Sequence, residues 1–222
     1  MSRASRLLPA WLAACLLAPL NVALQAAQAP PRPPSYCPHC VECQARPGSP
    51  RSVGVKLYNQ SRLDDAALLP LLDVANRIWL PYGVQIQAVT RTDGVALVVG
   101  NGHRQPATRA GGLVLGDTLF SDSHATPYIR LWLGAAELVA TDASTPNLQF
   151  VALPARERDD VLVQMMGVAF AHELAHYLLD TGTHSDRGLL RAALTAGEFE
   201  RPDLARLELT PAQQRVMCST GK

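Results

Sequence analysis

The chain has 222 residues, enough for one domain with a substantial core or for one domain with appendages. Its formal net charge of +1 predicts neither a nucleic-acid groove nor an electrostatic attraction to membranes. Aromatic residues are few, and the apolar residues are mostly Ala, Leu and Val, as is usual in a globular protein.

The first 29 residues have the layout of a secretory signal peptide. A basic start precedes an apolar run from Leu7 to Leu24, and small residues follow at 26–29. An N-terminal membrane anchor is the alternative, but Pro9 and Pro19 interrupt a run that is already short for a span. We therefore expect an exported protein, secreted or periplasmic, with no stable membrane span once the signal peptide is removed.

Cysteine usage fits an oxidising compartment. One of five cysteines, Cys15, ends a lipoprotein-like motif within the signal peptide; anchoring there is the weaker interpretation, because strongly apolar sequence continues after it. The exported chain then holds four cysteines: Cys37, Cys40, Cys43 and Cys218. An even number predicts two disulfides, one of them reaching Cys218. Metal binding by the first three cysteines with His39, or a redox pair of Cys37 and Cys40, stays open.

Residues 30–51 form a linker segment rich in proline and cysteine, and the folded domain is expected over 52–222. Alternating or short apolar runs predict five strands, at 53–57, 84–88, 95–99, 113–115 and 129–133. A helix is expected from a Ser61 cap, with Asp64 and Asp65 in its first turn, to a stop before Pro81.

Two more helices complete the expected domain. A long one is predicted over about 156–179, and a last one from Thr210, with Pro211 in its first turn. The order predicts an α+β domain, in which a mixed twisted sheet packs against a long helix from the N-terminal half, the helix over 156–179 and a C-terminal helix.

The segment His172-Glu173-Leu174-Ala175-His176 lies on that long helix and points to metal chemistry. Residues i and i+4 share one face of a helix, so the two imidazoles can bind one Zn²⁺. Glu173 can then act as the general base for a zinc-bound water. The surrounding helix is nearly uncharged, so these polar groups need partners, and a shared metal supplies one. Core histidines bonded to the backbone are the alternative.

A catalytic zinc needs a third protein ligand, and His184 is the favoured candidate. The helix is expected to stop at 180–182, with Gly182 supporting a left-handed turn that brings His184 back to the metal. The other candidates for the third ligand are acidic residues downstream, which we expect instead to form a solvent-exposed charged stretch. These residues are Asp186, Glu198, Glu200 and Asp203.

The segment from His172 to Ala192, HELAHYLLDTGTHSDRGLLRA, resembles the active-site region of metzincin-type zinc peptidases. It is most similar to small, largely uncharacterised bacterial metallopeptidases with the motif His-Glu-x-x-His, seven residues, then His-Ser. The resemblance implies His172, His176 and His184 as zinc ligands and Glu173 as general base. It is specific for about twenty residues, continues weakly through 209–213, and otherwise rests on the order of strands and helices, which is metzincin-like.

Two departures from the metzincin pattern stand out. Seven residues rather than five separate the second and third histidines, with Leu179 and Asp180 where a glycine is usual. Leu190 stands where the family has the methionine that forms an apolar floor under the metal, and leucine has a similar volume.

The sequence therefore predicts a zinc-dependent metallopeptidase of the endopeptidase kind, with peptide or protein substrates. Residues 111–116 are the candidate sheet edge along which a substrate adds as a strand. The alternative, which the sequence supports equally, is that they form an ordinary strand of the sheet with no role in substrate binding. A catalytically inactive zinc-binding relative that binds peptides or proteins is the first rival function. A redox or metal-binding module at the N-terminal cysteines is the second, and a cysteine covering the zinc is a further possibility. His103 and His124 are expected in exposed loops.

Overall fold

The alternating apolar residues build a five-stranded mixed sheet in the computed structural model, which describes residues 50–103, 114–142 and 150–220, all within one compact unit. The strands are β1 (Arg51–Gln60), β2 (Val84–Ala88), β3 (Val95–Gly100), β4 (Gly116–Ser121) and β5 (His124–Trp132). Their order is β2-β1-β3-β5-β4, with β4 antiparallel to β5 at one edge and the other pairings parallel.

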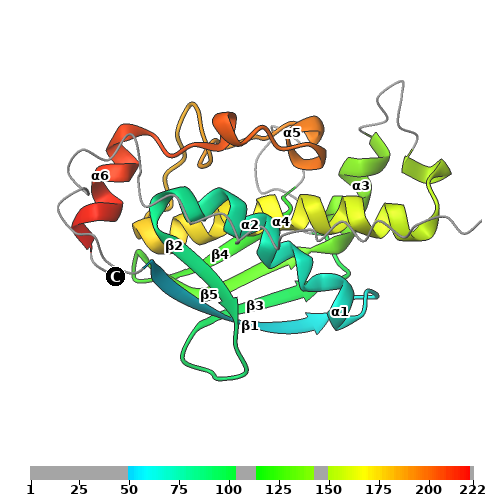
Figure 1. The fold of residues 1–222 in the computed structure, drawn as a ribbon, viewed down its shortest axis with the longest axis horizontal. Coiled ribbons are helices and arrows are strands. Elements are labelled where there is room, and N and C mark those ends of the chain that lie inside the picture. Colours follow the sequence, from blue (N-terminus) through cyan, green and yellow to red (C-terminus); the bar gives the residue numbers. More distant parts are fainter. Residues whose placement is uncertain (1–49, 104–113, 143–149, 221–222) are drawn as a thin grey trace, which may run out of the picture. The chain divides into compact units, whose positions relative to one another are not determined.

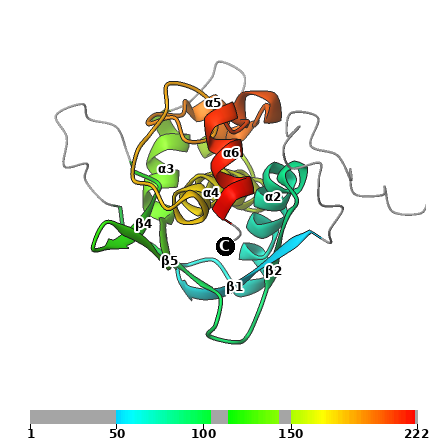
Figure 2. The same ribbon diagram turned by 90° about the vertical axis from the view of Figure 1, so that its left-hand side faces the viewer.

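Helices cover one face of this sheet (Figures 1 and 2). The α-helices are α1 (Asp65–Leu68), α2 (Pro70–Trp79), α3 (Leu133–Asp142), α4 (Ala155–Leu179), α5 (Ala196–Glu200) and α6 (Pro211–Thr220). Short 3-10 turns are η2 (Leu80–Tyr82), η3 (Phe150–Ala152) and η4 (Leu204–Leu207). In β3, Val95, Leu97 and Val99 are buried and alternate with less buried residues, so one face of the sheet carries the core. The α+β prediction is confirmed.

The helix expected from Ser61 is divided in two. Asp64 rather than Ser61 caps α1, because its carboxylate accepts a hydrogen bond from the amide of Ala67 at 2.7 Å. Pro70 then begins α2. Proline suits this position because the N–H groups of the first turn have no partner within the helix, so its missing N–H costs no hydrogen bond. Helix α3 was not predicted; it follows β5 directly, with no turn residue between them.

The fourth strand was predicted in the wrong place. The apolar run 113–115 precedes β4, which begins at Gly116 and carries fewer apolar side chains. Residue 113 lies outside the described residues, and Leu115 is buried but lies outside β4. The pairing of β4 with β5 shifts register between Thr118 and Phe120, which marks a local irregularity at the edge of the sheet.

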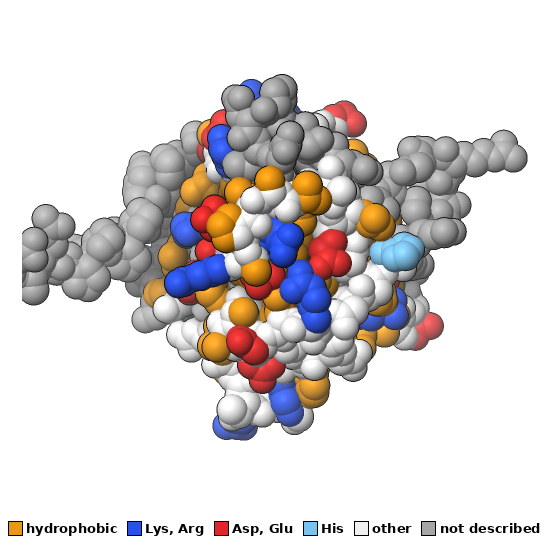
Figure 3. Space-filling view, turned by 90° about the vertical axis from the view of Figure 1, so that its right-hand side faces the viewer, with side chains coloured by type: hydrophobic (Ala, Val, Ile, Leu, Met, Phe, Trp, Pro, Cys, Tyr) orange, Lys and Arg blue, Asp and Glu red, His pale blue; other side chains and the backbone are white. Residues whose placement is uncertain are grey.

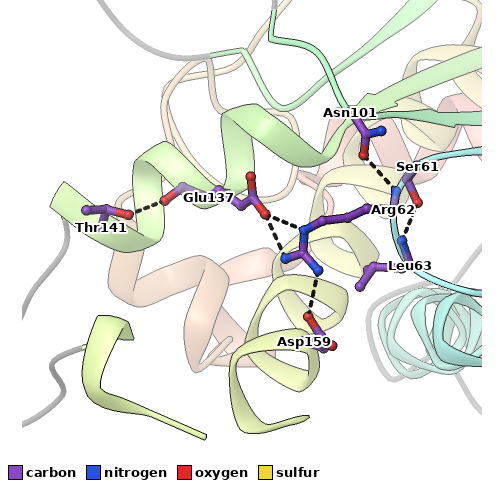
Figure 4. A network of polar contacts seen from close by, with 7 residues as sticks. All are labelled: Ser61, Arg62, Leu63, Asn101, Glu137, Thr141 and Asp159. Atoms are coloured by element: carbon purple, nitrogen blue, oxygen red, sulfur yellow. Dashed lines mark hydrogen bonds and ion pairs between the residues drawn. The ribbon is translucent and has the colours of Figure 1, made fainter. Parts of the chain in front are cut away.

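A polar network ties the carboxyl ends of β1 and β3 to the helices (Figure 4). The guanidinium of Arg62 donates to Glu137 of α3 at 2.7 Å and to Asp159 of α4 at 3.2 Å, while its backbone amide donates to Asn101. Basic and acidic side chains lie side by side over the face toward α3 (Figure 3). Exposed pairs contribute little singly, but this shared guanidinium fixes the first turns of α4 against α3.

None of the helices in the described parts of the chain is long and apolar enough to cross a membrane.

Candidate metal centre

Helix α4 carries three polar residues of the site in an otherwise apolar setting. Most of its residues from Leu162 to Leu179 are buried, so the helix is core on almost all sides. Glu173 is only 8% exposed and His176 5%, and His172 is partly buried. Polar groups in such surroundings must be bonded or must bind a ligand.

The structure brings His172, His176 and His184 together. One ring nitrogen of each lies within 4.8 Å of those of the other two, and the Nε2 atoms of His172 and His176 are 3.1 Å apart. Ligands held ~2.0–2.1 Å from a tetrahedral zinc are about 3.3 Å apart, so the spacing suits one such ion. Among the described residues, His172, His176 and His184 form a group of three side chains whose ligand atoms lie close enough together to hold a metal ion.

Backbone carbonyls orient the two helical imidazoles. Nδ1 of His172 donates to the carbonyl of Leu189 at 2.7 Å, and Nδ1 of His176 donates to that of Thr181 at 2.6 Å. Each ring therefore carries its proton on Nδ1, and the lone pair of Nε2 points toward the other ring. Two acceptors that face each other at 3.1 Å need a cation between them, and this donor set fits zinc.

The electrostatics keep these rings in the neutral form that metal ligation requires. Burial lowers the pKa of His172 from 6.5 to about 3, with a further decrease from the neighbouring His176. Burial also lowers the pKa of His176, and it lowers that of His184.

The segment after His184 is held by the C-terminal part of the chain. Gly188 has φ 79°, and a Cβ there would collide with the carbonyl oxygen of Glu208. The glycine thus lets Leu189 approach, and the amide of Leu189 donates to the same carbonyl at 3.2 Å. Since the carbonyl of Leu189 holds His172, this contact supports the metal centre. Leu190, which stands where the metzincin motif has methionine, is fully buried.

Glu173 faces the edge strand β4. The hydroxyl of Thr118 lies 2.9 Å from Oε2 of Glu173 and 2.8 Å from its carbonyl oxygen. A Cβ added to Gly116 would lie 3.0 Å from Cγ of Glu173, so the strand packs closely on this side chain. Burial raises the pKa of Glu173 to about 7, the Thr118 hydrogen bond opposes this, and the charge of Asp117 adds to it.

The other candidate ligands lie outside the group. Glu198 accepts from Arg191 at 2.6 Å and forms a capping box with Thr195 at the start of α5. Asp203 caps η4 through the amide of Ala205. Asp186 is exposed and is not in the three-residue group, and the side chain of Glu200 lies outside the described residues.

The turn at the end of α4 differs from the expected one. Asp180, not Gly182, adopts the left-handed conformation, with φ 50° and ψ 48°. His103 lies in an exposed loop, as expected. His124 is also exposed, but it begins strand β5 and does not lie in a loop, and its ring bonds to Asp180. Thr118 and Asp180 were not predicted as parts of the site. Asp180 had one signal in the sequence, since it stands with Leu179 where a glycine is usual in the motif that this segment resembles.

Several predictions fall on residues that the structure does not describe. These are the signal peptide, the linker over 30–49, the cysteines at 37, 40 and 43, and the side chain of Cys218. The signal peptide and the domain boundary at residue 52 stay predictions, and so do the disulfides.

Comparison with known proteins gives a structural likeness but no match in sequence. No family model matches the sequence, and no curated protein matches it. Among solved structures, a zinc-dependent peptidase from Methanocorpusculum labreanum is similar at a TM-score of 0.48 and 12% identity. The match covers 74% of this chain and 100% of that one.

Proposed function

We propose that this chain is an exported zinc-dependent peptidase with a metzincin-like active site. The proposal rests on one observation, the convergence of three imidazoles within 4.8 Å of one another beside a buried glutamate. His172, His176 and His184 are the proposed zinc ligands, and Glu173 is the proposed general base.

The chemistry divides between the metal and the side chains. When bound, zinc supplies a Lewis acid that polarises the scissile carbonyl and increases the acidity of water. His172 and His176 would hold the ion through Nε2, because Nδ1 of each keeps its proton and donates it in a hydrogen bond to a backbone carbonyl, and His184 would be the third ligand. Glu173 accepts the proton of the attacking water and delivers it to the leaving amine nitrogen. Thr118 keeps the carboxylate of Glu173 in place.

The edge position of β4 favours peptide substrates. This strand pairs with β5 on one side and ends the sheet on the other, and its Thr118 contacts Glu173. An extended peptide that adds to this edge places its backbone along the metal centre, as in β-strand addition. The proposed mode is endopeptidase cleavage, because strand addition recognises the backbone along the length of a peptide and needs no free terminus.

Metal analysis and a protease assay test the function together. Wild type is expected to bind one zinc and to cleave an unfolded protein substrate. His184→Ala should lose most of its bound zinc, and His103→Ala, an exposed histidine outside the group, is the matched control. Glu173→Gln should keep zinc and lose activity by about 10²–10⁴-fold.

The outcomes separate the rival functions. A wild type that holds zinc and cleaves nothing is the inactive, peptide-binding relative. A wild type without zinc at stoichiometric level contradicts the metal centre. Export is tested separately, since mass spectrometry of protein from the culture medium or periplasm should show a chain that lacks its first residues.

A further inference from the structure

Helix α4 ends in a residue with an uncommon backbone conformation. Asp180 has φ 50°, in the left-handed region that glycine adopts most readily and that aspartate and asparagine tolerate. The amide of Asp180 donates to the carbonyl of Tyr177 at 3.3 Å, and that of Thr181 donates to His176 at 3.1 Å. A glycine would form this turn with less strain, so the carboxylate needs a separate explanation.

The carboxylate of Asp180 reaches the hairpin that joins β4 to β5. Oδ1 accepts from the backbone amide of Ala125 at 2.7 Å, and Oδ2 accepts from Nδ1 of His124 at 2.8 Å. The Asp180 side chain is 19% exposed, whereas His124 is 77% exposed, so the bond to Ala125 is the better shielded of the two. The two residues at the hairpin tip, Asp122 and Ser123, both have positive φ, typical of a tight two-residue turn.

The loop that follows Asp180 carries the third histidine of the site. Ahead of His184, its own hydrogen bonds stay within α4 and the loop: Thr183 donates to the hydroxyl of Thr181 at 3.1 Å, and the carbonyl of Thr181 accepts from His176. Behind His184, the amide of Ser185 donates to the carbonyl of Leu190 at 2.8 Å, and its hydroxyl accepts from Gln213 of α6 at 3.3 Å. The Asp180 carboxylate, in contrast, fixes the start of the loop to the sheet.

We infer that Asp180 is a positioning residue of the metal centre, which fastens the loop bearing Thr181 and His184 to the β4–β5 hairpin. The inference rests on the proposed zinc site. The same hairpin meets α4 a second time through Thr118 and Glu173, so it contacts both the proposed general base and the start of the loop that carries the third histidine. Asp180 acts through the backbone that it anchors and does not itself belong to the histidine group.

Two substitutions separate the anchor from the turn. Asp180→Gly keeps the left-handed turn and removes both bonds to the hairpin. Asp180→Asn tolerates the turn and keeps an oxygen for the amide of Ala125. Each zinc-loaded protein is mixed with a colorimetric zinc chelator, and the rate at which the chelator takes up zinc is recorded. Asp180→Gly should release zinc about tenfold faster than wild type, and Asp180→Asn should stay within about twofold of it.

The thermal midpoint of the metal-free protein is the accompanying measurement. A purely structural role lowers it without a specific change in zinc release, whereas a positioning role accelerates release in a protein that still unfolds cooperatively. Hydrogen exchange of the Ala125 amide in wild type gives a test that needs no variant. By linkage, bound zinc should slow that exchange.

Equal release rates for wild type and Asp180→Gly would overturn the inference, and so would exchange at Ala125 that zinc leaves unchanged. These results leave the proposed function intact, because wild type still binds zinc. A wild type that binds no zinc removes the proposed function and this inference together.

Discussion

The hydroxyl of Thr118 lies between two oxygens of one residue, 2.9 Å from Oε2 of Glu173 and 2.8 Å from its carbonyl oxygen. A single hydroxyl proton can be donated to one of them at a time. The hydroxyl therefore lies against both the side chain and the backbone of Glu173, and the hydrogen bond that it donates to the carboxylate competes with the one to the carbonyl.

Loss of this hydroxyl should slow the chemical step. Thr118→Val keeps the shape of the side chain but cannot donate, so the carboxylate of Glu173 loses a fixed orientation. We expect kcat to fall by about tenfold with KM and zinc content unchanged. Thr118→Ser, which restores the hydroxyl, should recover most of the rate. A lower zinc content in Thr118→Val would assign Thr118 to the metal centre instead.

Glu173 should make the metal-free protein less stable at high pH. Its folded-state pKa is raised from 4.5 to about 7, so the folded chain holds this proton more tightly than the unfolded chain. Stability is therefore lost as the pH rises from 4.5 through 7. Glu173→Gln has no such loss and should be more stable at pH 8 by on the order of 1 kcal/mol, or about 2–4 °C in Tm.

Calorimetry of the metal-free proteins at two pH values checks this prediction. The difference between Glu173→Gln and wild type should shrink at pH 4.5, where both side chains are largely neutral. A variant less stable than wild type at pH 8 would contradict the assigned direction of the pKa.

Glu198 should affect stability and not metal content. The hydrogen bond from Arg191 lowers its pKa from 4.5 to about 2, with further contributions from Thr195. The stabilisation is complete above pH 4.5 and is lost as the pH falls toward 2. Glu198→Gln should unfold at lower urea than wild type at pH 7, and the two midpoints should converge as the pH falls below 4.5. Zinc content should equal that of wild type; a loss of zinc would restore Glu198 as a candidate ligand.

Two glycines should respond oppositely to alanine. A Cβ on Gly167 of α4 would lie 2.7 Å from Cγ1 of Val74 and 2.9 Å from the carbonyl oxygen of Leu71, where α2 packs closely. Gly167→Ala should therefore lower the free energy of unfolding by about 1–3 kcal/mol, despite the better helix propensity of alanine. A Cβ on Gly197 of α5 meets nothing within 4 Å, so Gly197→Ala should be neutral or stabilising. Urea titration compares them.

The elements that can be predicted from the sequence are those with a repeated spacing of residues. Alternation at Val95, Leu97 and Val99 identifies β3, and the spacing of His172 and His176 identifies one face of α4. Contacts that join distant segments leave no such pattern. Thr118 is 55 residues away from Glu173 in sequence, and nothing in its neighbours indicates the contact.

Local competition explains the remaining errors. Ser61 and Asp64 can both cap a helix, and the hydroxyl of Ser61 instead bonds to the side chain of Asn59. Gly182 is the residue that most easily adopts a left-handed turn, but the hydrogen bonds of the Asp180 carboxylate to the hairpin accompany that turn two residues earlier. Local side-chain bonds thus decide where α1 begins, whereas tertiary bonds accompany the turn that ends α4.

The close approach at Gly188 extends the site well beyond the residues that define it. The three histidines of the group all precede residue 185, yet the imidazole of His172 donates to the carbonyl of Leu189, whose amide is bonded to Glu208. A chain that terminates before residue 207 would keep three histidines and the glutamate but would lose the support behind the first of them. Such a shortened protein should hold its ion weakly, although its signature motif is intact.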